Sequence, residues 1–165
     1  MFKNKFKNYT MKEPKIFDPQ RLYNYGLWLL SRRDYSKYEL FTKMKKYQPE
    51  EKIIEEILQK LEKNSFLNDK RVINSVYQTY SKKESASKIK NRLILKGINK
   101  DDIGDFLSDN TDSTKELESA TVLLIKKFKY YNPELTKKYY SMLANKGFSW
   151  DIVSKAVTQF KEQED

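Results

Sequence analysis

The feature that most restricts the fold of this chain is a motif that returns after 50 residues. Lys96-Gly97-Ile98-Asn99 aligns with Lys146-Gly147-Phe148-Ser149, and the apolar positions that follow the two segments also align. A related segment, Lys46-Tyr47-Gln48-Pro49, stands one repeat earlier with a slip of one residue. Repeats of about this length are typical of helical proteins in which each unit chiefly contacts its neighbours. The sequence therefore predicts three tandem units.

Each unit is predicted to contain three helices, because apolar residues recur at helical spacing between capping residues. Asp18 precedes a proline at the start of the first helix, and Ser36 begins a capping box at the start of the second. Pro49 opens a third helix with an apolar stripe of Ile and Leu. The same order returns from Asn68 and again from about Ser113.

Glycine and asparagine mark the later helix boundaries. Gly97 fits the left-handed position just after a helix, and Asn99 caps the next helix. Asn132, which precedes a proline, is predicted to cap the helix that Gly147 closes, and Ser149 starts the last helix.

We divide the chain into a basic N-terminal tail and three three-helix repeats, with limits at 1–17, 18–67, 68–110 and 111–165. The predicted fold class is all-α, and the three tandem three-helix repeats are expected to form an elongated, curved helical array. A single irregular helix bundle is the alternative, because apolar stripes and capped turns also occur in bundles. Both interpretations are all-α.

Several function classes are excluded by residues that the chain lacks. It has no cysteine and no histidine, so disulfides, thiolate nucleophiles, the usual zinc sites and histidine-based triads cannot form. The paired carboxylates Glu50-Glu51, Glu55-Glu56 and Asp101-Asp102 fall in first helical turns or on solvated faces, which accounts for them without catalysis. We expect a monomeric protein that is not an enzyme and needs no cofactor or metal. Because no apolar run suits a secretory signal or a membrane span, we expect it in the cytoplasm.

The charge balance favours a polyanion or an acidic protein surface as partner, since 33 Lys and Arg against 23 Asp and Glu give a net charge of +10. Basic clusters are predicted at the ends of the first, fourth and seventh helices, and the middle unit carries more. The candidate contact residues are Arg32, Arg33, Arg71, Lys82, Lys83, Lys88, Lys90, Arg92, Lys96, Lys126, Lys127 and Lys129. Two plainer interpretations stay open: basic residues stabilise helix C-termini, and a lysine-rich genome raises lysine everywhere.

Aromatic residues are a weaker signal. The pairs Tyr130-Tyr131 and Tyr139-Tyr140 lie close to lysines, as stacking on exposed bases would require, but one member of each pair must face inward. Most of these rings are therefore expected in the core. The short second helices also resemble helix-turn-helix readers, a motif too common to decide the matter.

Four segments match the signatures of one known family in order and spacing. They are Leu29-Leu30-Ser31-Arg32-Arg33-Asp34-Tyr35-Ser36 with Glu39-Leu40, Phe66-Leu67-Asn68-Asp69-Lys70-Arg71, Leu95-Lys96-Gly97-Ile98 and Lys146-Gly147-Phe148. On these segments the chain resembles the RecX family over roughly residues 22 to 160. It departs from the family at Val72, which replaces a phenylalanine, and at Lys83-Glu84-Ser85-Ala86, where Gly-x-Gly-Pro is usual. The first helix of the third unit also matches weakly.

The resemblance implies a regulator of the RecA recombinase in DNA repair, recombination and the SOS response. Such proteins bind the RecA filament on single-stranded DNA, lodge in its helical groove and limit filament growth, ATP hydrolysis and strand exchange. The resemblance also implies direct DNA binding in some members. The alternative is a helical nucleic-acid-binding module that acts without RecA, whose affinity would fall steeply with salt.

Overall fold

The computed structural model describes residues 16–163, so most of the basic tail predicted at 1–17 lies outside the described residues. The described chain folds into nine α-helices, one 3-10 helix and connecting turns, without a strand. The α-helices are α1 (Pro19–Leu30), α2 (Lys37–Met44), α3 (Glu51–Lys63), α4 (Asp69–Tyr80), α5 (Ala86–Leu95), α6 (Lys100–Asn110), α7 (Ser113–Phe128), α8 (Thr136–Asn145) and α9 (Trp150–Glu162), and the 3-10 helix is η1 (Pro133–Leu135).

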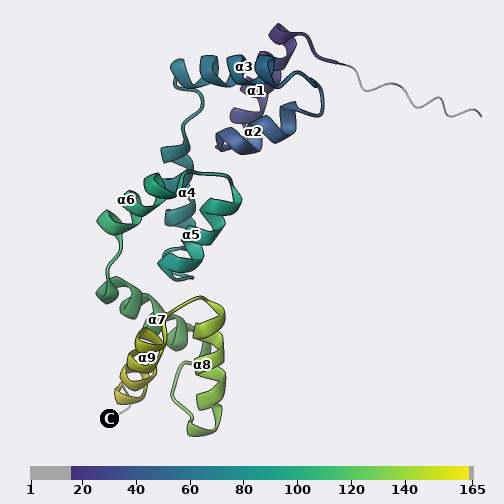
Figure 1. Ribbon diagram of the computed structural model, residues 1–165. Helices are drawn as coiled ribbons and strands as arrows, with labels where there is room; N and C mark the ends of the chain where they lie inside the picture. Colours follow the sequence, from purple (N-terminus) through teal and green to yellow (C-terminus); the bar gives the residue numbers. More distant parts are fainter. Residues whose placement is uncertain (1–15, 164–165) are drawn as a thin grey trace, which may run out of the picture.

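The helices form three units in a row, each with its own apolar core (Figure 1). We call α1 to α3 unit 1, α4 to α6 unit 2, and α7 to α9 unit 3. The extensive helix–helix contacts of the described chain all lie within single units. The prediction of an all-α fold with three tandem three-helix repeats is confirmed, and the array is elongated and curved. The residue limits of the three repeats stay a prediction.

Most of the helices begin at a side-chain cap, at the positions that the sequence predicts. The Asp18 carboxylate accepts from the Arg21 N–H (2.8 Å), and Ser36 and Glu39 form the predicted capping box of α2. Two boundaries differ from the prediction. Asn132 caps the short helix η1 rather than α8, and α3 begins at Glu51 without a side-chain cap, two residues after Pro49.

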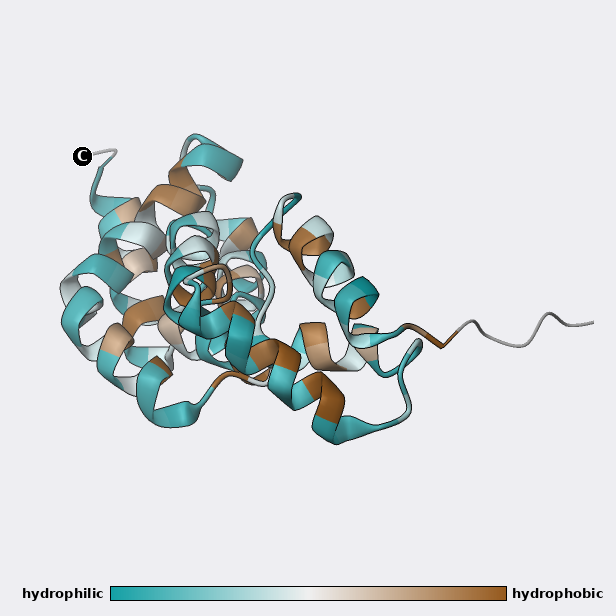
Figure 2. Ribbon diagram, turned by 90° about the horizontal axis from the view of Figure 1, so that it is seen from above, coloured by the Kyte–Doolittle hydropathy of each residue, from teal (hydrophilic) through white to brown (hydrophobic). Residues whose placement is uncertain are grey.

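Each helix buries one apolar side, and hydrophobic and hydrophilic segments alternate along the helices accordingly (Figure 2). Leu22, Leu40 and Ile54 lie at the centre of unit 1 and are completely buried. In unit 3 the ring of Tyr139 is also completely buried, and its hydroxyl donates a hydrogen bond to the Asn132 carbonyl (3.1 Å). Because burial of a side chain of this size contributes about 1.5–3 kcal/mol, these cores can stabilise the units separately.

The basic clusters do not stand at equivalent helix positions. α1 ends at Leu30 and α4 at Tyr80, so Arg32-Arg33 and Lys82-Lys83 lie in the turns that follow, whereas Lys126-Lys127 lies inside the last turn of α7. The prediction that all three clusters end helices holds only for α7. Within residues 16–163, no helix is both long and apolar enough to cross a membrane.

Candidate partner-binding face

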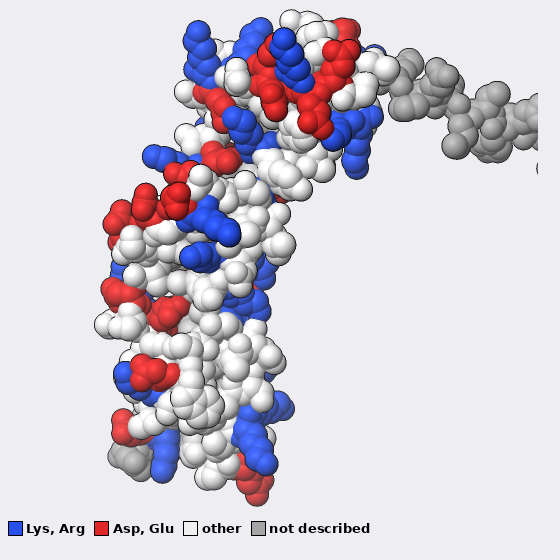
Figure 3. Space-filling model, viewed as in Figure 1, with Lys and Arg blue, Asp and Glu red and all other residues white. Residues whose placement is uncertain are grey.

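The second helix of each unit lies along the concave side of the array, so that α2, α5 and α8 follow one another, with α6 and α9 on the other side of their units (Figure 1). α5 and α8 carry basic residues and no acidic residue. By contrast, α6 carries four aspartates and one lysine, and α3 carries four glutamates and three lysines. Acidic atoms gather over α3 and α6 in Figure 3. The second helices thus carry a net positive charge, whereas α3 and α6 are net negative and α9 has equal numbers of acidic and basic residues; the contrast is strongest in unit 2.

Core packing fixes which side chains of these helices reach solvent. α5 and α8 each anchor two apolar residues in the core of their unit, namely Ile89 and Leu93 in α5, and Tyr139 and Leu143 in α8. Lys90, Lys137 and Lys138 are exposed as a result, and their side chains make no hydrogen bond or ion pair within the described residues. We call the exposed side of α2, α5 and α8 the second-helix face, and these three lysines are its unpaired cations.

The structure divides the predicted contact residues into two groups. The first group is exposed, and its side chains make no hydrogen bond or ion pair within residues 16–163; it comprises Arg32, Lys82, Lys83, Lys90, Lys126, Lys127 and Lys129. The second group makes specific contacts inside the protein and comprises Arg33, Arg71, Lys88, Arg92 and Lys96. The Arg33 guanidinium pairs with Glu39 (3.2 Å), for example, and Arg71 donates to the Ser65 carbonyl (3.2 Å). Contact of these residues with a partner stays a prediction.

Lys96 is part of the joint between units 1 and 2. Its carbonyl accepts from the Ser36 hydroxyl (2.5 Å), and its ammonium pairs with Glu39 (2.9 Å). At the same joint the Lys37 N–H, at the start of α2, donates to the Asp69 carboxylate (2.9 Å). The start of a second helix therefore docks on the Lys-Gly turn of the next unit and on the first helix of that unit.

The joint between units 2 and 3 repeats this arrangement. The Ser85 N–H, at the start of α5, donates to the Lys146 carbonyl (3.1 Å), and the Ala86 N–H donates to the Glu116 carboxylate of α7 (2.6 Å). Lys88 spans the same joint, since its ammonium donates to the carbonyl of the last residue of α8 (2.5 Å). A carboxylate facing the N-terminus of a helix is favoured by the helix dipole, which explains the acidic partner at both joints.

The two repeated glycines are required by these joints. Gly97 and Gly147 have positive φ angles of 72° and 88°, as predicted for Gly97. A Cβ on Gly97 would lie 2.4 Å from the Tyr38 Cβ, and one on Gly147 would lie 2.7 Å from the Ser85 Oγ. The glycines thus allow both the left-handed turn and the close approach of the preceding unit.

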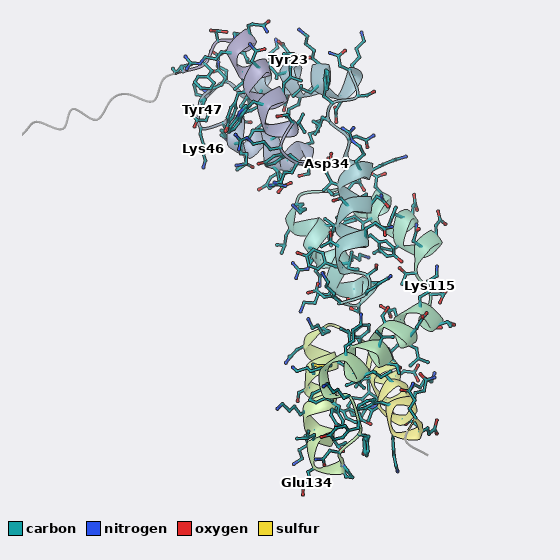
Figure 4. The ribbon with its side chains drawn as sticks, turned by 180° about the vertical axis from the view of Figure 1, so that it is seen from behind. Tyr23, Asp34, Lys46, Tyr47, Lys115 and Glu134 are labelled. Carbon is teal, nitrogen blue, oxygen red and sulfur yellow. The ribbon has the colours of Figure 1, made fainter. Side chains whose placement is uncertain are left out.

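Unit 1 is the first unit of the described residues, and its equivalent turn carries Tyr47 in place of glycine. This turn is covered by the residues just before α1, because the Phe17 N–H donates to the Tyr47 carbonyl (2.8 Å) and the two rings stack 4.5 Å apart. Figure 4 shows Tyr47 and Lys46 at the edge of unit 1 where the chain enters α1. The Tyr47 turn is therefore covered by a neighbouring segment of the same unit, whereas the two Lys-Gly turns are covered by the preceding unit.

Arg92 holds the turn between α4 and α5, where the sequence departs from the family pattern. Its guanidinium makes two bonds to the Glu84 carboxylate (2.6 and 2.8 Å) and lies 4.2 Å from the centre of the Tyr80 ring. Glu84 is only 7% exposed. A two-bond ion pair thus holds the turn between α4 and α5.

Changing Arg92 to alanine is expected to lower the free energy of unfolding by about 2 kcal/mol, because the buried Glu84 carboxylate loses its partner. Lys90→Ala is the matched control: Lys90 is an exposed cation of the same helix without a partner, and its removal should change stability by less than about 0.5 kcal/mol. Urea unfolding of both variants gives the comparison. Equal losses would show that the ion pair does not support the turn.

Two carboxylates have pKa values below the ordinary glutamate value. The hydrogen bonds from Arg92 lower the pKa of Glu84 more than burial raises it. Burial of Glu39 would raise its pKa, but the Ser36 N–H, Lys96 and Arg33 together outweigh burial and lower it. The pKa of Asp69 is raised, chiefly by burial.

These directions predict a loss of stability in acid. A carboxylate with a lowered folded-state pKa stabilises the fold fully above its unfolded-state pKa, and this contribution is lost as the pH falls through the folded-state value. Asp69 acts in the opposite sense and offsets part of the loss. We expect the melting temperature to fall between about pH 5 and pH 3, and to fall less in Glu84→Gln. An unchanged pH profile in that variant would contradict the role of Glu84.

Lys82 and Lys126 come from different units but line one cleft of about 340 Å³ between the end of α4 and α7. The cleft is also lined by Lys115 and by Glu84, Glu116 and Glu118. Positive and negative groups are equal in number there, so the cleft does not select an anion by charge.

Sequence reasoning missed Lys137 and Lys138, because it searched for basic runs at helix ends. Summing the charge of each helix would have found them, since α8 has no acidic residue to offset the two lysines. Within residues 16–163 no group of acidic side chains is arranged to hold a metal ion. The arrangement of the described residues offers a charged binding surface.

Comparisons with known proteins agree with one another. The family model for RecX, first three-helix domain, matches residues 23–61. The regulatory protein RecX of Haemophilus influenzae (strain PittEE) is 30% identical over 149 residues, covering 87% of this chain and 97% of that protein. The regulatory protein RecX of Chlorobium phaeobacteroides (strain BS1) is 28% identical over 147 residues, covering 86% and 95%.

Solved structures show the same likeness. The crystal structure of RecX from Lactobacillus salivarius superposes with a TM-score of 0.73 at 26% identity, covering 86% of this chain and 96% of that one. A second crystal structure of a regulatory protein RecX gives a TM-score of 0.70 at 25% identity. The likeness therefore extends over all three units.

Proposed function

The chain belongs to the RecX family of regulatory proteins, and from this membership we propose that it binds the RecA recombinase filament and restrains filament growth, ATP hydrolysis and strand exchange. The observation that carries the proposal is the net positive charge of all three second helices, which the third helices do not share. A partner with a regular anionic surface is attracted by the side that carries the second helices and not by the side that carries the third helices.

The repeat supports binding to a filament in particular. Three units joined by the same contacts present similar faces at regular intervals, and a filament presents identical subunits at regular intervals. Individual contacts can then be weak, because each contact raises the effective concentration of the next one. In this proposal the unpaired cations Lys90, Lys137 and Lys138 contact the filament.

The predicted residues divide between two roles. We propose that the exposed, unpaired group from Arg32 to Lys129 adds to the electrostatic attraction that guides the encounter. The paired residues Lys88, Arg92 and Lys96 hold the joints and the α4–α5 turn, and so act on binding through the shape of the array.

The test adds the full chain to preformed RecA filaments on single-stranded DNA and follows ATP hydrolysis together with co-sedimentation. The proposal expects binding to the filaments and falling hydrolysis as the protein is added. A DNA-only control separates binding to RecA from binding to DNA. Unchanged hydrolysis and no excess of bound protein over that control would refute the proposal.

A further inference from the structure

The two joints of the array share one contact, which allows their other residues to be compared position by position. At the first residue of the second helix, the Lys37 N–H donates to Asp69 in the joint between units 1 and 2 (2.9 Å), and the Ala86 N–H donates to Glu116 in the joint between units 2 and 3 (2.6 Å). Lys37 therefore corresponds to Ala86, and Asp69 corresponds to Glu116.

The joint between units 1 and 2 is also closed by an ion pair between units. Arg71 of α4 lies 3.6 Å from Asp34, in the turn before α2. Asp34 stands three residues before the donor of the shared contact, and Arg71 stands two residues after its acceptor. The same count in the next joint gives Lys83 and Glu118. Both joints therefore carry opposite charges at these two positions, with the signs exchanged.

In the joint between units 2 and 3 this pair is open. The side chains of Lys83 and Glu118 are exposed and make no hydrogen bond or ion pair within residues 16–163. Glu118 instead lines the cleft of about 340 Å³ between the end of α4 and α7, together with Lys82 and the partly exposed Val122. Figure 4 shows Lys115, another lining residue, where the chain passes from unit 2 into unit 3. The cleft thus lies where an ion pair would close the joint.

The contacts between units 2 and 3 leave room for a rotation, because they are few and gather at two places. One place is the start of α5, where Ser85, Ala86 and Lys88 bond to unit 3. The other is the link between α6 and α7, where Lys115 donates to the Asn110 carbonyl (2.9 Å). The extensive helix–helix contacts lie within the units. A rotation about the line through the two places narrows the cleft while these bonds persist.

We propose that the joint between units 2 and 3 has a second, closed state, in which Glu118 pairs with Lys83 or its neighbour Lys82. Closure also covers the Val122 side chain, which favours it further. An exposed ion pair shifts an equilibrium by up to about fivefold, so both states are populated and the curvature of the array is adjustable at this joint. The closed state belongs to the free chain and does not depend on RecA.

The experiment measures a distance across this joint in the full chain. The sequence contains no cysteine, so Gln78→Cys on α4 and Thr158→Cys on α9 introduce two unique sites for spin labels. Both positions are exposed and lie outside the cleft lining. Double electron–electron resonance at low salt is expected to give two distances, one of which is lost as salt screens the ion pair. A single distance that salt leaves unchanged would refute the second state.

Charge variants of the labelled chain identify the pair. Glu118→Lys places like charges opposite Lys82 and Lys83, and is expected to lower the ratio of closed to open molecules by about fivefold or more. Adding Lys82→Glu and Lys83→Glu to this variant restores opposite charges, now with the signs that Asp34 and Arg71 have in the joint between units 1 and 2. The combined variant is therefore expected to recover the closed state.

The matched control is Glu134→Lys, which changes the net charge as Glu118→Lys does but lies at the far tip of unit 3 (Figure 4). It should leave the ratio unchanged, and circular dichroism checks that all variants fold. The pair is wrongly assigned if Glu118→Lys keeps the ratio of the unaltered chain, if Glu134→Lys lowers it as much, or if the combined variant fails to recover it. RecA is absent throughout, so failure here is distinct from failure of the filament proposal.

Discussion

A chain in which Lys90, Lys137 and Lys138 are all changed to glutamate is expected to bind RecA filaments about a hundredfold more weakly. Each exposed charge contributes up to about 1 kcal/mol to such a contact, and reversal replaces attraction by repulsion. The three lysines have no ion-pair partner within the described residues, so the variant should fold normally. Co-sedimentation over a range of protein concentrations measures the loss.

The matched control reverses Lys52, Lys100 and Lys161, which are exposed and lie on the third helices α3, α6 and α9. Both variants change the net charge equally, so bulk electrostatics affects them alike. The control is expected to bind within a few-fold of the unaltered chain. Equal losses in the two variants would mean that net charge, rather than one face, determines binding.

Gly97→Val is expected to cost at least about 2 kcal/mol of stability and to separate units 1 and 2. A β-branched residue is disfavoured at the left-handed φ of this turn, and its Cβ would collide with the Tyr38 side chain of the preceding unit. The bonds of Ser36 and Glu39 to Lys96 are then lost with the joint. Thermal unfolding measures the cost, and small-angle X-ray scattering should show a larger radius of gyration.

Gly104→Ala is the control for this substitution. Gly104 lies within α6, where an added Cβ would meet no atom within 4 Å. Alanine there should raise stability by about 0.5–1 kcal/mol, because glycine is a poor helix former. If Gly97→Val were as stable and as compact as Gly104→Ala, the joint would not depend on close approach at the Lys-Gly turn.

The fold could be predicted from the sequence because its signals are local. Ser36 and Glu39 meet across one helical turn, Asn68 and Ser149 each cap the helix that follows them, and Gly97 ends the helix before it. The 50-residue repeat then predicted that three such units follow one another along the chain. Where the prediction missed, the deciding contact was also local: Asn132 stabilises a 3-10 turn before α8 begins.

The roles of the basic residues could not be predicted, because their partners are distant in the sequence. Lys96 pairs with Glu39, which is 57 residues away, and Lys88 bonds to the carbonyl of Asn145, also 57 residues away. From the sequence alone, Lys88 and Lys96 cannot be distinguished from Lys90, the unpaired lysine between them. Only the docking of one unit on the next distinguishes a lysine that holds a joint from one that makes no ion pair within the described residues.

The most direct test of the central claim is a crosslinking measurement that asks which face meets the filament. A photoreactive side chain is placed at position 90 or 138 on the second-helix face, or at position 100 or 161 on the third helices, and the protein is irradiated on RecA filaments. Our account predicts RecA adducts from positions 90 and 138 and few or none from the other two. Adducts that form mainly from positions 100 and 161 would contradict it.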